Sequence, residues 1–351
     1  MTLGNPAAEL GRLASRPVRR WMLAFVAISV AFTGCSLTTR SGDAPSSREP
    51  SASAATSATS GTSATSGASA TSGPAGPASD LLVLADGVQG SAGLWIYDES
   101  TGWTAIAPLA GATALGRDGD DLTLALGGSL EVRKVSSSGQ AGTRLQVSWP
   151  AQESAGSVVA ASRSPSGRTA VVRVDANEPT FFLVTADGSV SLLSPAPAGA
   201  FSPLVAWIDA DRLVALSTDA EQISRLAVID TAGRSSSTLR AVGGVRVFAV
   251  SPDRGSLAAA TESAVYIAPV SDWIDGVAPA KGLTLGSSEV VWDLALDADG
   301  SHLAMLSGTE SADGNVTDVH EIGYARTGSS WQKIFDAPVP FTHAIGQVWL
   351  G

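Results

Sequence analysis

The sequence predicts an all-β fold, a six-bladed β-propeller with four strands in each blade. Three observations lead to this prediction: short apolar runs bounded by turn-forming residues, a turn that recurs about every 45 residues, and a final apolar run with no partner after it. All three lie in residues 80–351, the part of the 351-residue chain whose composition fits a folded domain.

The short apolar runs indicate strands rather than helices. Residues 81–84, 94–97 and 181–184 read Leu-Leu-Val-Leu, Leu-Trp-Ile-Tyr and Phe-Phe-Leu-Val. Short runs rich in β-branched and aromatic side chains, bounded by Gly, Asp, Ser and Pro, are typical of strands. The sustained apolar period of 3.6 residues that a helix requires is nearly absent beyond residue 80.

A turn of similar sequence recurs through the domain. Its copies begin at Arg117, Ser164, Ile208, Ser251 and Leu296, which are 47, 44, 43 and 45 residues apart. An apolar strand follows each copy, at 122–126, 169–174, 213–216, 257–260 and 303–306. A second strand and a more polar third strand complete each unit. A period near 45 residues with four strands per unit is typical of propeller blades.

The two ends of the domain indicate how many blades there are. Residues 80–108 supply three strands, with no inner strand before them, and residues 343–351 supply one strand with nothing after it. Trp349 in this last strand corresponds to Trp207 in an earlier unit. We expect the C-terminal strand to pair into blade 1, because the pairing leaves no open edge and gives six blades. An insertion around 308–318 lengthens the last unit.

The turn sequence resembles that of known propellers. Ser251-Pro252-Asp253, followed by a strand, is similar to the Trp-Ser-Pro-Asp-Gly motif of TolB-like and WD-type propellers. Over residues 80–351 the chain resembles the propeller part of LpqB-type actinobacterial lipoproteins. It lacks the sizeable domain that precedes the propeller in those proteins. The resemblance therefore implies the fold, but it does not extend to their signalling role.

Residues 1–34 have the features of an export signal. Arg16, Arg19 and Arg20 precede twelve mostly apolar residues, 21–32. This run is shorter than the roughly 20 residues of a membrane-spanning helix and fits the apolar region of a signal peptide. The sequence Phe32-Thr33-Gly34-Cys35 follows directly and resembles the lipobox of bacterial lipoproteins. The resemblance implies diacylglyceryl transfer to the Cys35 thiol and cleavage after Gly34.

Residues 35–79 are predicted to be the lipidated cysteine and a disordered linker. Cys35 is the only cysteine of the chain, so neither an intrachain disulfide nor a Cys-based metal site can form. Residues 36–79 are almost all Ser, Ala, Thr, Gly and Pro, and have nothing to bury. As a random coil they would span about 35–40 Å. They would act as a spacer, with O-glycosylation as an alternative role.

The charge of the chain excludes some partners. The formal net charge is −11, and the four Arg and one Glu of residues 1–34 leave about −14 for the remainder. Such a chain repels the phosphates of nucleic acids and anionic lipid headgroups. We therefore expect no nucleic-acid partner, and we expect membrane attachment only through the N-terminal lipid.

The histidines do not form a catalytic set in the sequence. No Gly-x-Ser-x-Gly elbow, Walker loop or zinc motif is present. We expect His302, at the start of a strand, to be a surface residue. His343 could face the central channel, but no partner for it is evident, so a structural role is favoured. His320 lies in the insertion of the last unit.

Two acidic segments could bind Ca²⁺, which prefers 6 to 8 oxygen ligands. In the insertion, Asp313, Asn315 and Asp318 gather oxygen atoms, but Asp-Gly-Asn is also an ordinary turn. The segment 297–300, Asp-Ala-Asp-Gly, falls at the hairpin position of its blade. We favour turns in both cases and assign no metal ligand.

The tryptophans could stack on sugars or pack in the core. Eight lie in the domain, namely Trp95, Trp103, Trp149, Trp207, Trp273, Trp292, Trp331 and Trp349. Trp103 and Trp331 occupy equivalent positions in their units, which favours packing between blades.

The sequence thus predicts a lipoprotein on the extracytoplasmic face of the cell membrane, whose propeller is a scaffold that binds an envelope protein or glycan. We predict no enzymatic activity, catalytic residue or cofactor. Two alternatives stay open. One is a metal-dependent, lactonase-like propeller enzyme, which needs Asp, Asn or Glu pointing inward from several blades. The other is a receptor lipoprotein for sugars or peptides.

Overall fold

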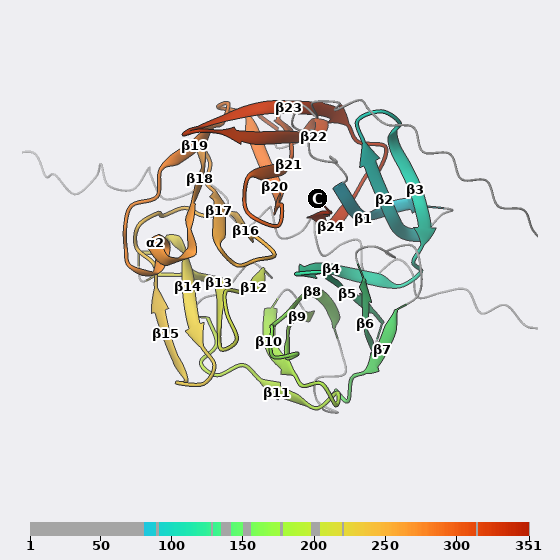
Figure 1. Ribbon diagram of the computed structural model, residues 1–351, viewed down its shortest axis with the longest axis vertical. Helices are drawn as coiled ribbons and strands as arrows, with labels where there is room; N and C mark the ends of the chain where they lie inside the picture. Colours follow the sequence, from blue (N-terminus) through green and yellow to red (C-terminus); the bar gives the residue numbers. More distant parts are fainter. Residues whose placement is uncertain are drawn as a thin grey trace, which may run out of the picture. The chain divides into compact units, whose positions relative to one another are not determined.

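The structure is a computed structural model that describes residues 81–350 except 89–90, 128, 135–141, 150–155, 176–177, 198–203, 220 and 314. The described residues form six four-stranded antiparallel sheets arranged in a ring (Figure 1). The predicted six-bladed β-propeller is confirmed. Within this part of the chain, no helix has the length and hydropathy to span a membrane.

The strands of each blade follow one another from the centre of the ring outward. Blade 1 contains β24 (Ala344–Trp349), β1 (Leu81–Val88), β2 (Ser91–Asp98) and β3 (Gly102–Pro108). Blade 2 contains β4 (Ala112–Asp118), β5 (Asp121–Leu126), β6 (Ser129–Lys134) and β7 (Thr143–Gln146). Blade 3 contains β8 (Ser157–Arg163), β9 (Thr169–Asp175), β10 (Glu178–Val184) and β11 (Val190–Leu192).

Blade 4 contains β12 (Val205–Trp207), β13 (Arg212–Thr218), β14 (Ser224–Asp230) and β15 (Ser235–Thr238). Blade 5 contains β16 (Val247–Val250), β17 (Ser256–Ala260), β18 (Ala264–Pro269) and β19 (Lys281–Thr284), with the short helix α2 (Val270–Ile274) between β18 and β19. Blade 6 contains β20 (Glu289–Leu296), β21 (His302–Glu310), β22 (Val316–Thr327) and β23 (Ser330–Pro338). The insertion of the last unit is the long β21–β22 hairpin.

The C-terminal strand closes the ring, as predicted. β24 pairs antiparallel with β1, with Trp349 opposite Leu81 and Gly346 opposite Leu84. The C-terminal strand β24 consequently lies near the centre of the ring (Figure 1). The blade therefore joins both ends of the domain and leaves no inner edge of β1 unpaired.

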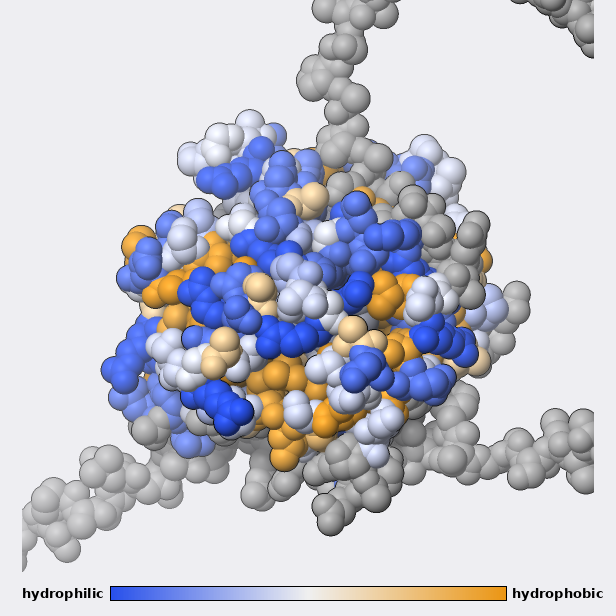
Figure 2. All heavy atoms as spheres, turned by 60° about the horizontal axis from the view of Figure 1, so that its bottom comes forward, coloured by the Kyte–Doolittle hydropathy of each residue, from blue (hydrophilic) through white to orange (hydrophobic). Residues whose placement is uncertain are grey.

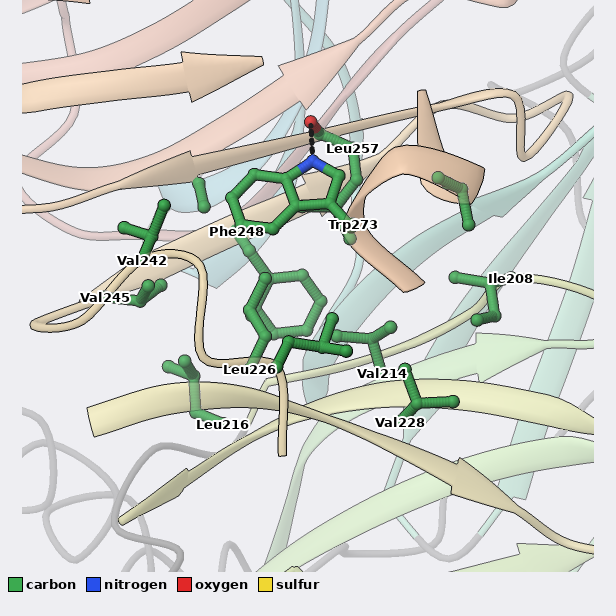
Figure 3. Packing of buried hydrophobic residues seen from close by; sticks show 13 residues of the cluster. Ile208, Val214, Leu216, Leu226, Val228, Val242, Val245, Phe248, Leu257 and Trp273 are labelled. Carbon is green, nitrogen blue, oxygen red and sulfur yellow. Dashed lines mark hydrogen bonds between the residues drawn. The ribbon is translucent and has the colours of Figure 1, made fainter. Parts of the chain in front are cut away.

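The core lies between neighbouring blades. Each of the six interfaces holds a cluster of buried apolar side chains, since the faces of a radial sheet can be covered only by the next blade. Figure 3 shows the cluster between blades 4 and 5, where Trp273 is 1% exposed and its indole N–H donates to the carbonyl of Leu257 at 3.2 Å. The hydrogen bond lets this large side chain be buried without an orphaned donor.

The paired tryptophans pack between blades, which confirms the packing interpretation for them. Trp103 of β3 packs against the cluster between blades 6 and 1, with its ring centroid 5.3 Å from that of Phe341. Trp331 of β23 packs against the cluster between blades 5 and 6. Trp207 and Trp349 are both buried at the ends of innermost strands, so their predicted equivalence also holds.

On the face shown in Figure 2, hydrophilic side chains cover much of the surface, with smaller hydrophobic patches between them.

Candidate functional site

The five recurring turns lie on one rim of the propeller, which we call the turn rim. They join the first and second strands of blades 2 to 6 at residues 119–120, 164–168, 208–211, 251–255 and 297–301. Neighbouring turns are bonded to one another: the backbone N–H of Asp253 donates to the carbonyl of Ala298 at 3.2 Å. The rim is therefore a continuous surface built from several blades.

Local side-chain hydrogen bonds explain why Asp and Ser recur in these turns. Oδ1 of Asp209 accepts the backbone N–H groups of Asp211 at 2.9 Å and Arg212 at 2.6 Å. In the next turn, Oδ1 of Asp253 accepts the N–H of Gly255 at 2.8 Å and the hydroxyl of Ser251 at 2.5 Å. Such bonds satisfy turn N–H groups that no strand pairs.

Charged side chains close the channel mouth at the centre of the turn rim. Arg254 of blade 5 forms an ion pair with Asp118 of blade 2, and both side chains are mostly buried. Beside them, Arg163 pairs with Asp121 at 2.9 Å, and Arg117 donates to the carbonyl of Trp349. A cavity of about 20 Å³ lies here, lined by Arg117, Asp118, Ser162, Arg163, Ala206, Trp207, Val250, Ser251, Pro252 and Arg254. It has space for little more than one water molecule.

A larger hollow of about 330 Å³ opens further out on the turn rim, in blade 4. We call it the acidic hollow; it is lined by Asp209, Ala210, Asp211, Arg212, Asp230 and Ala232. The lining thus contains three carboxylates, those of Asp209, Asp211 and Asp230, and one guanidinium, that of Arg212.

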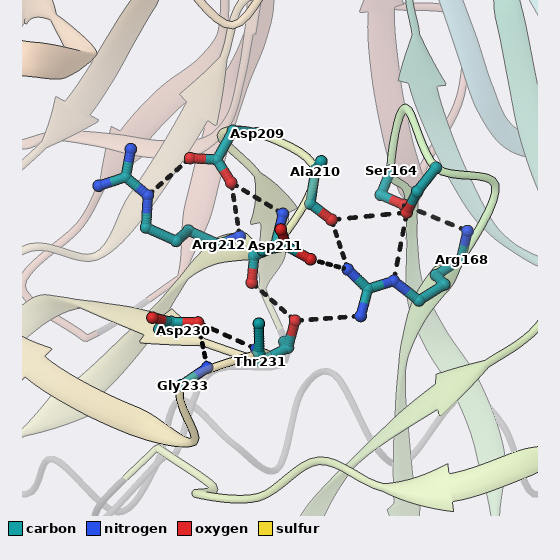
Figure 4. Close-up of polar contacts among 11 residues, drawn as sticks. Ser164, Arg168, Asp209, Ala210, Asp211, Arg212, Asp230, Thr231 and Gly233 are labelled. Carbon is teal, nitrogen blue, oxygen red and sulfur yellow. Dashed lines mark hydrogen bonds and ion pairs between the residues drawn. The ribbon is translucent and has the colours of Figure 1, made fainter.

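Hydrogen bonds and ion pairs fix the walls of the acidic hollow (Figure 4). Nε of Arg212 lies 2.6 Å from Oδ2 of Asp209, and Nη2 of Arg168 lies 2.7 Å from Oδ1 of Asp211. Oδ1 of Asp230 accepts the N–H groups of Ala232 at 2.9 Å and Gly233 at 2.7 Å. Asp230 is therefore held by backbone groups, which carry no full positive charge.

The carboxylate of Asp209 is ionised at neutral pH. Burial by itself raises its pKa, but the hydrogen bonds from Arg212 and from the backbone N–H groups of Asp211 and Arg212 outweigh burial and hold the pKa below its usual value. The acidic hollow can therefore present a negative potential to a positively charged group.

The prediction that His302 is a surface residue is wrong. Its side chain is only 14% exposed, and its ring stacks on Trp349 with 5.6 Å between centroids. Nδ1 of His302 lies 2.6 Å from Oδ2 of Asp297 and 2.9 Å from Oγ of Ser301. The sequence missed this because the covering residue, Trp349, comes from blade 1.

The Ser301, His302 and Asp297 contacts do not have the geometry of a nucleophilic triad. In such a triad the Ser hydroxyl bonds to Nε2 of the imidazole and the carboxylate to Nδ1. Here both the hydroxyl and the carboxylate bond to Nδ1. The arrangement holds the β20–β21 turn, and the turn interpretation of residues 297–300 is confirmed.

The other two histidines are paired on the surface. His343 has a partner that the sequence did not reveal, since its Nδ1 lies 3.1 Å from Oδ2 of Asp86 at the end of β1. Its neighbouring backbone N–H groups also donate to Asp86, which supports the structural role. Nδ1 of His320 lies 2.6 Å from Oδ1 of Asp336.

The predicted site residues of the insertion and the N-terminus have different outcomes. In the insertion, Ser311 and Asn315 bond to each other across a turn, which favours the turn over a Ca²⁺ loop containing Asp313 and Asp318. Among the described residues, no group of three or more His, Cys, Asp and Glu side chains could hold a metal ion. Cys35 and the linker lie outside the described residues.

Sequence reasoning missed two acidic residues in strands of blade 6. Burial raises the pKa of Asp293 in β20 to about 7. Burial and the nearby charge of Asp293 together raise the pKa of Glu321 in β22 well above its usual value. For Asp293 the available signal was a carboxyl group within an apolar run, Val290-Val291-Trp292-Asp293-Leu294, whereas the strand of Glu321 contains several polar residues.

No protein-family model and no curated protein sequence matches the chain. Solved structures share its fold. TolB from Acinetobacter baumannii has a TM-score of 0.55 at 10% identity, over 78% of this chain and 66% of that one. A chain of the nidogen/laminin complex has a TM-score of 0.53 at 10% identity, over 77% of this chain and 97% of that one.

A putative TolB from Agrobacterium tumefaciens has a TM-score of 0.50 at 13% identity, over 76% of this chain and 92% of that one. At these identities the likeness shows the fold alone, because one propeller fold carries many functions.

Proposed function

We propose that the chain is an extracytoplasmic lipoprotein, anchored by acyl chains on Cys35, whose propeller binds a basic segment of an envelope protein in the acidic hollow of the turn rim. The observation that carries the binding proposal is the set of three carboxylates around one open hollow, only one guanidinium being in its lining. The lipobox-like sequence before Cys35 supports the anchor.

The charges of the acidic hollow favour a cationic partner. Arg212 and Arg168 are engaged with Asp209 and Asp211, whereas Asp230 is held by backbone N–H groups. A Lys or Arg side chain entering the hollow would add the missing positive charge. Electrostatic complementarity of this kind raises association rates and selects partners.

The anchor is tested by fractionation. Cys35→Ala should release the full chain from the membrane fraction, because an acidic chain repels anionic lipid headgroups and stable anchoring needs multiple acyl chains. Retention of the variant in membranes would contradict the anchor and leave the binding proposal to its own test.

The binding rim is tested by photo-crosslinking in the native envelope. A photoreactive residue replaces Ala232, at the acidic hollow, or Ser263, in an exposed turn on the opposite rim. We expect a specific adduct from position 232 and none from 263. Adding Asp211→Asn and Asp230→Asn should lower the yield about tenfold, and so should raising the salt concentration. Equal adducts from both positions would overturn the proposed rim.

A further inference from the structure

Two carboxyl groups of blade 6 face blade 1 at the seam where the ring closes. Asp293 of β20 lies opposite Leu306 of β21, and Leu306 lies opposite Glu321 of β22. Directly opposed residues share one face of a sheet. Leu306 packs in one cluster with Leu81 and Val83 of blade 1. Both carboxyl groups therefore point into the interface between blades 6 and 1.

Gln347 of β24 approaches the same place from blade 1. It lies opposite Val83, on the face that packs against blade 6. Its backbone N–H bonds to Asp293, and its Nε2 lies 3.5 Å from the carbonyl oxygen of Ala304 in β21. The side-chain amide of Gln347 therefore contacts β21 two residues from Leu306. Its nitrogen is used in this contact, and its oxygen Oε1 is left without a partner within the described part of the chain.

Three oxygen atoms at this seam are buried without a hydrogen-bond partner among the described residues. Two of them are the carboxylate oxygens of Glu321, and the third is Oε1 of Gln347. The residue Glu321 is 0% exposed and the residue Gln347 is 6% exposed. A buried charge without a partner is strongly unfavourable. A second carboxyl group alongside adds repulsion, and it cannot donate a compensating charge.

We propose that Asp293, Glu321 and Gln347 bind a divalent cation of the Ca²⁺ type between blades 6 and 1. Two carboxylates balance a charge of +2, and hard oxygen donors are the ligands that Ca²⁺ prefers. The three side chains offer up to five oxygen atoms towards the 6 to 8 that Ca²⁺ takes. The residue Asp293 as a whole is half-buried, and water would complete the coordination of the ion.

A cation at this position would link blade 6 to blade 1. Its ligands come from β20, β22 and the C-terminal strand β24, so the ion would join the last blade to the strand that completes blade 1. Binding to the folded ring and not to the unfolded chain stabilises the fold by mass action. Ca²⁺ alone should therefore raise the free energy of unfolding of the domain, without any other ligand.

The test is a thermal-unfolding titration of the purified full-length chain, first stripped with EDTA and then supplied with Ca²⁺. We expect Tm to rise by roughly 5 to 10 °C at a hundredfold excess over Kd, with one equivalent of bound Ca²⁺ by elemental analysis. Glu321→Gln and Asp293→Asn should weaken Ca²⁺ binding at least tenfold. Glu262→Gln, which changes an exposed carboxylate of blade 5, should leave binding unchanged.

The wild-type titration decides the matter even if a seam variant fails to fold. No bound Ca²⁺ and no Ca²⁺-dependent Tm would overturn the site. So would a Glu321→Gln variant that keeps wild-type Ca²⁺ affinity. A wild type that ignores Ca²⁺ while Glu321→Gln raises Tm in EDTA would instead identify a protonated carboxyl pair, which also overturns the cation site.

Discussion

Arg254 and Asp118 form an ion pair across the mouth of the central channel. Arg254 belongs to the β16–β17 turn of blade 5 and Asp118 to the end of β4 in blade 2, which are opposite blades of a six-membered ring. The pair therefore ties together parts of the propeller that share no blade interface, and it closes the channel on the turn rim.

Breaking this pair should destabilise the ring, because the remaining partner stays mostly buried. We expect a double-mutant cycle of Arg254→Met and Asp118→Asn to give a coupling energy of about 1–3 kcal/mol from urea midpoints. The matched control is Arg246 with Glu262, whose side chains are 42% and 80% exposed. That exposed pair should give less than about 0.5 kcal/mol. Equal coupling in both cycles would show that the channel pair is no stronger than a surface pair.

The closing strand should contribute strongly to stability through Trp349. Its side chain is 0% exposed and stacks against His302 of blade 6. Trp349→Ala should lower the free energy of unfolding by about 3–5 kcal/mol, since it leaves a large cavity at the seam. Leu192→Ala, at a side chain 60% exposed in β11, should change it by less than about 0.5 kcal/mol. A small effect of Trp349→Ala would mean that the ring does not depend on the closure.

The stability of blade 2 should depend on pH through Glu131. Burial alone raises the pKa of Glu131, but the backbone N–H of Gly142 and the side chains of Arg144 and Arg133 outweigh it and lower the pKa. These groups lie 2.7, 2.8 and 2.7 Å from its carboxylate oxygens. The pKa of Glu131 is thus lower in the folded state than in the unfolded state, where it is about 4.3. Its ionised carboxylate stabilises the fold fully at a pH above the unfolded-state pKa, and this stabilisation is lost as the pH falls through the folded-state pKa.

Glu131→Gln should therefore cost roughly 2–4 kcal/mol at pH 7, and the difference from wild type should shrink as pH falls below about 4. Urea unfolding at several pH values measures both quantities. The exposed variant Glu262→Gln should track the wild type throughout. A Glu131→Gln deficit that stays constant down to pH 3 would argue against an ionised carboxylate as its source.

Gly323 in β22 should not tolerate a side chain. A Cβ at this position would lie 2.1 Å from the ring of Phe335 in the paired strand β23. We expect Gly323→Ala to lower the free energy of unfolding by about 1–3 kcal/mol, and Phe335→Leu to relieve part of this in the double variant. Gly286→Ala serves as the control, because its nearest contact would be an ordinary 3.7 Å. Equal stability of the two alanine variants would contradict the close approach.

The sequence by itself determined the architecture, and it did so through local and periodic signals. The recurring turns at Ser164, Ile208 and Ser251 mark the blades because their Asp and Ser side chains accept backbone N–H groups a few residues away. The strand missing before residue 81 and the surplus strand at Trp349 specified the closure, because an unpaired edge is costly in any sheet.

Only the tertiary structure decided which distant side chains meet. The ion pair of Arg254 with Asp118, the covering of His302 by Trp349, and the contact of the Gln347 amide with the carbonyl of Ala304 all cross blade boundaries. In an alternating strand a polar residue reads as solvent-facing, since the pattern does not say what covers that face. In a ring of blades both faces are covered, so a carboxyl group such as that of Glu321 is buried by a neighbour that its own strand does not predict.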